Sequence, residues 1–134
     1  MEETIRILVV DDEPDIRRIC RILLENSGYT VLEAATGLEA VETIRRCPEI
    51  DLILMDIMMP VMDGVRLCKL VKQNLRTCHI PVYMLSAKVD IKYQLEGLQV
   101  GADDYIAKPF SMEVLRTKIL NMLRTRYRIF ERYS

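Results

Sequence analysis

IRILVVDD at residues 5–12 and DLILMD at residues 51–56 are the two stretches that decide the fold of this chain. Each combines a short run of Ile, Leu and Val with acidic residues at its end. A run of this length that is apolar throughout is typical of a parallel strand buried on both faces. The carboxyl ends of such strands form the binding edge of an open α/β sheet. We therefore expect Asp11, Asp12 and Asp56 to gather at one edge.

Strand-like and helix-like stretches alternate along the chain. Five strand–helix units with short connections favour a parallel sheet with helices on both faces, because crossovers between parallel strands are right-handed. Pro14 suits a first helical turn, Gly28 a helix C-cap and Ser111 an N-cap. The sequence thus predicts a doubly wound α/β fold. The expected strands are residues 5–10, 30–34, 52–56, 81–86 and 104–107, and the expected helices are residues 14–27, 37–46, 64–74, 90–100 and 111–128.

The three carboxylates indicate a metal site. Like charges held close together stay ionised only if a cation lies among them, and oxygen ligands suit Mg²⁺. Lys108 follows the strand-like stretch DYIA and precedes Pro109, so its ammonium group is expected to project towards the same carboxylates. A hard cation, a nucleophilic carboxylate and a fixed positive charge are suited to phosphoryl transfer.

Size and composition exclude several classes of protein. A chain of 134 residues fits one domain, and its apolar stretches are far shorter than a membrane span requires. The start MEETIRILVV has acidic residues where a secretory signal has basic ones, so we expect a cytoplasmic protein without membrane contact. The spacing of the four cysteines fits neither a redox pair nor a zinc site, which favours reduced thiols with packing roles: Cys20, Cys47, Cys68 and Cys78.

Charge is distributed unevenly. Residues 1–115 have a net charge of −6, whereas residues 116–134 have a net charge of +5. A short basic helix without a groove-reading motif is more often a solvated face than a nucleic-acid interface. We therefore expect no direct nucleic-acid contact by this chain.

Four motifs at the ends of expected strands identify a family resemblance: VVDDEP at 9–14, MDIMMPVMDG at 55–64, LSA at 85–87 and DDYIAKPF at 103–110. With these, the chain resembles the receiver domains of two-component response regulators from about Ile5 to Leu123. The resemblance implies a flavodoxin-like fold with a five-stranded parallel sheet in the strand order 2-1-3-4-5, and a site where that order reverses. It divides the chain into a receiver domain, residues 1–124, and an extension of the last helix or a linker towards an output module, residues 125–134.

The resemblance also implies a role for each site residue. Asp56 would be the phosphorylation site, taking a phosphoryl group from the phosphohistidine of a histidine kinase. Asp12 and Asp56 would hold Mg²⁺ directly, with Asp11 nearby or acting through water and the backbone carbonyl of Met58 as a further ligand. The corresponding ordinary interpretation of Asp56 is an acidic residue that keeps a loop soluble.

Further positions match the catalytic and switch residues of the family. Ser86 and Lys108 would each contact a phosphoryl oxygen, and the Lys108–Pro109 peptide bond is expected to be cis. Tyr105 would turn inward as Ser86 moves towards the phosphate, and Ala87 would leave the entrance of the site open. Ser86 could equally cap the following helix, and Tyr105 could be an ordinary half-buried edge aromatic.

The implied output is a change in the surface formed by residues 90–100, 104–107 and 111–128. This surface would contact an output domain or a partner protein, or form a homodimer. Leu123, Tyr127 and Phe130 recur at helical spacing beyond the usual end of the domain, which indicates either a connector or dimer contact or a frayed tail. The stretch TKILNMLRTRYRIFE is similar to the junction in hybrid sensor kinases whose receiver precedes a transcription domain.

Two other functions remain open at this point. A haloacid-dehalogenase-like phosphatase also uses a strand-end Asp, Mg²⁺ and a Lys, but it carries a second Asp two residues after the nucleophile, where this chain has Met58. An inert interaction domain would keep the site without using it. We expect a signalling switch that turns over no free substrate. Because Met58 cannot position a water by a side-chain hydrogen bond, we also expect a long-lived acyl phosphate.

Overall fold

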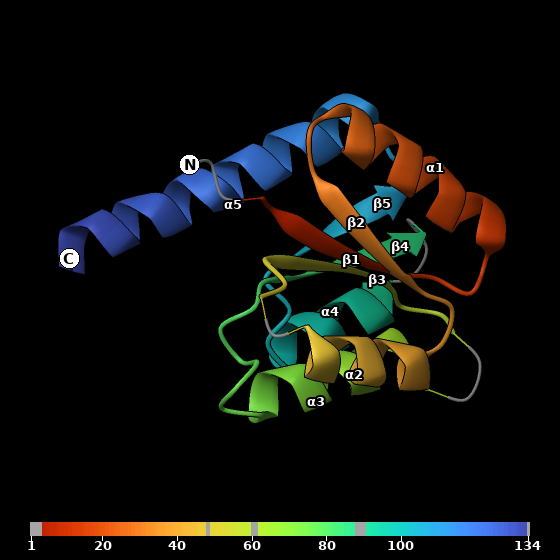
Figure 1. Ribbon diagram of the computed structural model, residues 1–134. Coiled ribbons are helices and arrows are strands. Elements are labelled where there is room, and N and C mark those ends of the chain that lie inside the picture. The colour runs from red at the N-terminus through yellow and green to blue at the C-terminus, as the bar shows by residue number, and fades with distance from the viewer. Residues whose placement is uncertain (1–3, 48, 60–61, 88–90, 134) are drawn as a thin grey trace.

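The computed structural model describes residues 4–47, 49–59, 62–87 and 91–133, with the backbone alone for residues 127–133. Strands and helices alternate along it (Figure 1). In chain order the elements are β1 (Arg6–Val10), α1 (Pro14–Asn26), β2 (Thr30–Ala34), α2 (Gly37–Arg46), β3 (Leu52–Asp56), α3 (Gly64–Gln73), β4 (Val82–Ala87), α4 (Ile91–Gln99), β5 (Asp104–Lys108) and α5 (Met112–Tyr133).

All strand pairs are parallel, and the strands lie in the order β2-β1-β3-β4-β5. The predicted doubly wound α/β fold and its strand order are therefore confirmed. The order reverses between β1 and β3, so the carboxyl ends of these neighbouring strands flank the switch point. Asp11 directly follows β1, and Asp56 is the last residue of β3.

Helices cover both faces of the sheet: α1 and α5 on one, and α2, α3 and α4 on the other (Figure 1). Successive residues of β1 point to opposite faces, so Ile7 and Val9 join one apolar cluster and Leu8 and Val10 the other. All four are fully buried. Burying such side chains contributes roughly 1.5–3 kcal/mol each. The double-sided core explains why β1 and β3 are apolar at nearly every position.

The sequence placed the element boundaries within a few residues. The bounds of β2, α2 and β3 agree with the predicted ones, and α1 ends before Gly28, whose φ of +92° lies in the region that glycine tolerates. The Ser111 hydroxyl accepts a hydrogen bond from the Glu113 N–H at 3.2 Å, as expected of a helix cap. Asp90, the predicted start of the fourth helix, lies outside the described residues.

The last helix is longer than predicted. Helix α5 continues from Met112 to Tyr133, and its C-terminal part extends beyond the sheet (Figure 1). The predicted apolar stripe includes Tyr127 and Phe130, whose side chains lie outside the described part of the chain. Across the described residues, none of the helices is both long enough and apolar enough to cross a membrane.

Candidate phosphoacceptor site

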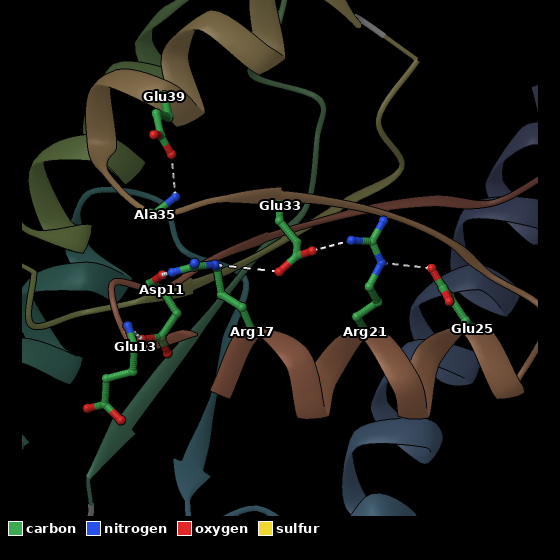
Figure 2. Close-up of polar contacts among 8 residues, drawn as sticks. All are labelled: Asp11, Glu13, Arg17, Arg21, Glu25, Glu33, Ala35 and Glu39. Atoms are coloured by element: carbon green, nitrogen blue, oxygen red, sulfur yellow. Dashed lines mark hydrogen bonds and ion pairs between the residues drawn. The ribbon is translucent and has the colours of Figure 1, made fainter. Parts of the chain in front are cut away.

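Asp11 is held in a fixed orientation after β1. Its side chain is completely buried, and its Oδ1 accepts a hydrogen bond from the Glu13 N–H at 2.9 Å. Its own N–H donates to the Ala34 carbonyl at 3.1 Å, which ties the loop to β2. The Arg17 guanidinium, one turn into α1, donates from Nη1 to the Asp11 carbonyl at 2.7 Å (Figure 2). The neighbouring Asp12 is exposed.

Arg17 belongs to a row of charged groups between α1 and β2 (Figure 2). Its Nε lies 3.5 Å from Glu33 of β2, and Glu33 also pairs with Arg21 of α1. Arg21 in turn pairs with Glu25 at 2.9 Å, one helical turn further along α1. The Arg21–Glu25 pair is exposed and adds little stability singly, whereas Arg17 and Glu33 are only partly exposed. The Arg17 contacts connect α1 with both the Asp11 loop and β2.

Asp56 ends the central strand β3 and is 6% exposed. Its Oδ1 accepts a hydrogen bond from the Met58 N–H at 3.4 Å. The start of α3 returns very close to it, because a Cβ at Gly64 would lie 2.3 Å from the Asp56 carbonyl oxygen and 2.9 Å from the Ile57 Cα. Only glycine fits there, and the Gly64 N–H donates to the Ile57 carbonyl at 2.8 Å. The side chain of Met58 is half-exposed beside this loop.

Lys108, the last residue of β5, joins the two buried carboxylates. Its Nζ lies 2.9 Å from Asp11 Oδ2 and 3.3 Å from Asp56 Oδ1. The Lys108–Pro109 peptide bond is cis, as expected. A strand at the edge of the sheet therefore delivers its ammonium group to carboxylates from two central strands.

The electrostatics of the cluster follow from this geometry. The pKa of Asp56 is raised to about 6 by burial and by the nearby charge of Asp11, and the Lys108 ammonium offsets only part of that rise. Burial lowers the pKa of Lys108, but its hydrogen bond to Asp11 and the charge of Asp56 outweigh this effect and raise it. Negative charge at Asp56 is therefore under-compensated by the protein alone.

The carboxylates fit a divalent cation. One oxygen from each of Asp11, Asp12 and Asp56 can be chosen so that all three lie within 4.8 Å of one another. The set consists of hard oxygen donors, one of them exposed, and it suits Mg²⁺ with several retained waters.

The remaining predicted site residues lie on β4 and β5. Ser86 lies near the end of β4, is 1% exposed, and accepts a hydrogen bond at its hydroxyl from the side chain of Gln94. Tyr105 lies on β5 in register with Met84 of β4 and is 39% exposed. Ala87, the last residue of β4, is half-buried.

Sequence reasoning missed two residues that contact the site. Gln94 of α4 contacts Ser86, and Arg17 of α1 contacts the Asp11 backbone. The one available signal for Gln94 was its position three residues before Gly97, on the helix face that turned out to be buried. Arg17 gave no signal, because it lies in a run of charged residues typical of a solvated helix.

Comparison with known proteins assigns the chain and its fold to one family. The model of the response regulator receiver domain matches residues 7–120. The chain is 44% identical to the transcriptional regulatory protein ResD of Bacillus subtilis, over 86% of this chain and 47% of the relative. It is 37% identical to a histidine kinase of Formosa agariphila, over 99% of this chain and 10% of the relative. The chain thus spans about half or less of the length of these curated relatives.

Solved structures agree. A response regulator from Chloroflexus aurantiacus superposes with a TM-score of 0.86 at 35% identity, covering 91% of this chain and 99% of the other. The chemotaxis protein CheY4 of Vibrio cholerae superposes with a TM-score of 0.83 at 32% identity, covering 90% and 99%. The chain therefore belongs to the response regulator receiver domain family of two-component signalling.

Proposed function

We propose that this domain is a phosphoacceptor switch in which Asp56 takes a phosphoryl group from the phosphohistidine of a histidine kinase. The observation that carries the proposal is the position of Lys108, whose ammonium lies 3.3 Å from Asp56 and 2.9 Å from Asp11. This arrangement brings a buried nucleophile and a fixed positive charge together beside a carboxylate cluster. Positioning and charge compensation of this kind carry most of the catalysis in phosphoryl transfer.

In the proposed step, one carboxylate oxygen of Asp56 forms a bond to phosphorus while the phosphorus–nitrogen bond to the kinase histidine breaks. The bonding electron pair stays on the imidazole nitrogen, which takes up a proton. Lys108 and the hydroxyl of Ser86 would each bind a phosphoryl oxygen as its charge develops. Asp56 reacts as the carboxylate, so a raised pKa in the metal-free protein opposes the reaction.

We propose that Asp12 and Asp56 hold Mg²⁺ directly, with Asp11 close by and the Met58 carbonyl as a further ligand. When bound, Mg²⁺ supplies charge compensation between the carboxylates and the incoming phosphoryl group. Its expected effect on the protein is to lower the pKa of Asp56 and keep that group ionised. The carboxylate spacing and the under-compensated charge at Asp56 support this assignment.

The proposed response takes place at the elements next to the end of β4, which are α4 and β5. Movement of Ser86 and inward rotation of Tyr105 would change the surface of α4, β5 and α5, which would contact an output domain, a partner protein or a second copy of the chain. Three apolar side chains of α4 support this use, because Ile91, Leu95 and Leu98 are 62%, 55% and 42% exposed. A cytoplasmic location goes with the same proposal.

We also propose that each domain accepts one phosphoryl group from its donor and does not turn over a free substrate. Met58 stands where a second catalytic carboxylate would be needed to hydrolyse a covalent intermediate quickly. The hydrogen bond from the Met58 N–H to Asp56 Oδ1 places this residue next to the proposed acceptor, and its thioether side chain, which positions no water as a carboxylate would, supports a long-lived acyl phosphate.

The test is the intact mass of the protein after exposure to acetyl phosphate, with and without Mg²⁺. We expect a gain of one phosphoryl group that requires Mg²⁺ and that Asp56→Asn abolishes. Asp15→Asn, which removes an exposed carboxylate from the first turn of α1, is the matched control and should be labelled like the wild type.

Two results would contradict the proposal. Labelling that survives Asp56→Asn would place the acceptor elsewhere. Continuous release of phosphate from small phosphate esters would indicate a phosphatase instead of a switch.

A further inference from the structure

Gln94 is a buried polar side chain on α4 with no role in the function proposed above. It is 8% exposed, although α4 lies at the surface and presents several apolar side chains to solvent. The helix packs closely on β4 one turn further along, where a Cβ at Gly97 would lie 2.2 Å from the Met84 Sδ. This close approach brings the Gln94 side chain to the end of β4.

The side-chain amide nitrogen of Gln94 carries two N–H groups, and it has two acceptors at that point. Gln94 Nε2 donates to the Ser86 hydroxyl oxygen at 2.8 Å and approaches the Ala87 carbonyl at 3.3 Å. A carbonyl oxygen can only accept, so the atom that faces Ala87 must be the nitrogen of the amide and not its oxygen. The orientation of the amide is therefore fixed by the backbone of β4.

This orientation determines what the Ser86 hydroxyl can do. A serine hydroxyl has one proton to donate and two acceptor lone pairs. Since the Gln94 N–H occupies one lone pair, the Ser86 proton cannot be donated to this amide nitrogen and must point in another direction. Ser86 is one residue beyond Leu85, which pairs in register with Asp56, so Ser86 lies on the neighbouring strand at the end of the sheet that carries the proposed acceptor.

We infer that Gln94 is a positioning residue, which directs the Ser86 proton towards the phosphoryl group and links that hydroxyl to α4. The inference rests on the proposed function, because it assigns Gln94 a role only through the contact between Ser86 and the phosphoryl group. It adds a chain-specific connection: any displacement of Ser86 towards the phosphate acts directly on α4 through a buried hydrogen bond.

The test is a double-mutant cycle on the initial rate of labelling by acetyl phosphate at saturating Mg²⁺, followed by intact mass. Gln94→Met keeps the length of the side chain and removes its donor. It should slow labelling about two- to tenfold, the factor that one neutral hydrogen bond supports. In a Ser86→Ala background the same substitution should cause no further loss, because no hydroxyl is left to direct.

Two controls separate positioning from general damage. Gln99→Met makes the same change at an exposed position of the same helix and should label like the wild type. The affinity of Gln94→Met for Mg²⁺, measured by titration without any phosphodonor, should equal that of the wild type, since Gln94 contacts none of the three carboxylates among its described hydrogen bonds.

Each alternative result has a distinct meaning. A wild-type protein that is not labelled at Asp56 overturns the proposed function and this inference with it. If the wild type is labelled, an unchanged or faster rate in Gln94→Met overturns the role of Gln94 alone. An equal loss in the wild-type and Ser86→Ala backgrounds, or a weakened Mg²⁺ affinity, also overturns it, because the effect would then not pass through Ser86.

Discussion

Strands β3 and β5 both deliver a charged side chain to the site, but they differ in how firmly the fold holds them. Every residue of β3 is buried, and the strand is paired on both sides. Strand β5 is the edge of the sheet, and only Ile106 among its five residues is buried. The proposed acceptor Asp56 thus lies on a central strand that is buried throughout, whereas Lys108 and Tyr105 lie where displacement disturbs less of the core. The difference teaches that one sheet can hold the proposed acceptor on a buried central strand while the groups that contact or respond to it lie on a partly exposed edge strand.

The largest expected effect is on stability and falls on the central strand. Leu54→Ala in β3 removes a fully buried side chain and should lower the free energy of unfolding by about 2–5 kcal/mol. Tyr105→Ala in β5 should cost about 1 kcal/mol or less, because that side chain is 39% exposed. Chemical denaturation of the two variants measures both values. Equal losses would contradict the contrast between the strands.

The acceptor itself should destabilise the metal-free protein at neutral pH. The pKa of Asp56 is raised from 3.8 to about 6 in the folded protein, so folding favours the protonated form. The contribution of protonated Asp56 to the free energy of unfolding is fully present below about pH 4 and is lost as the pH rises through about 6. Asp56→Asn should therefore be more stable than the wild type above pH 6, by up to about 3 kcal/mol.

The measurement is denaturation with a chelator at pH 4 and at pH 7.5. The advantage of Asp56→Asn should be small at the lower pH and should shrink at pH 7.5 when Mg²⁺ is added, because the cation favours the ionised wild-type carboxylate. A wild-type protein more stable than Asp56→Asn at pH 7.5 in the chelator would show that the charge of Asp56 is already fully compensated.

The return of α3 to the acceptor loop should be sensitive to a single methyl group. Gly64→Ala places a Cβ in contact with the backbone of Asp56 and Ile57, where no flexible side chain can move aside. We expect a loss of about 1–3 kcal/mol in stability and slower labelling of Asp56. Gly28→Ala, whose Cβ would meet nothing within 4 Å, tests for strain at positive φ alone and should leave labelling unchanged.

The smallest expected effect concerns the lifetime of the acyl phosphate. Met58→Asn would place a side chain that can hold a water beside Asp56, and we expect loss of the phosphoryl group to accelerate several-fold without a change in fold. The decay of the labelled mass in Mg²⁺, after removal of acetyl phosphate, gives the rate. The same decay rate in both proteins would remove Met58 from the explanation of lifetime.

The fold could be predicted well from the sequence because its central strands are patterned so strongly. The runs IRILVV and DLILM can bury their apolar side chains on both faces only between two layers of helices. The carboxylates that follow them then lie together, because parallel strands end at the same edge of the sheet. The meeting of Lys108 with Asp11 and Asp56 was predictable for the same reason, since all three lie at strand ends. The spacing of these groups, and so the raised pKa of Asp56, required the structure.

Contacts between helices and strand ends could not be predicted in this way. Whether Gln94 faces solvent or Ser86 depends on how closely α4 approaches β4, and that distance is set by the packing of Gly97 on Met84. The exact end of α5 was also not predicted, because the basic segment after residue 124 gives no clear end signal and both a helical extension and a linker were expected there. Tertiary packing decides the position of Gln94, and local sequence does not record it.

The central claim is that phosphorylation of Asp56, on the buried central strand β3, changes the structure of α4 and of the edge strand β5. The most direct measurement is the NMR spectrum of the backbone amides with acetyl phosphate and Mg²⁺ in excess. It is compared with the spectrum of the same protein in Mg²⁺ alone and with that of Asp56→Asn. The prediction is that amides of α4 and β5, Gln94 and Tyr105 among them, shift strongly, while those of Leu8 and Leu54 stay in place. Shifts spread evenly over the sheet, or none beyond the immediate neighbours of Asp56, would contradict it.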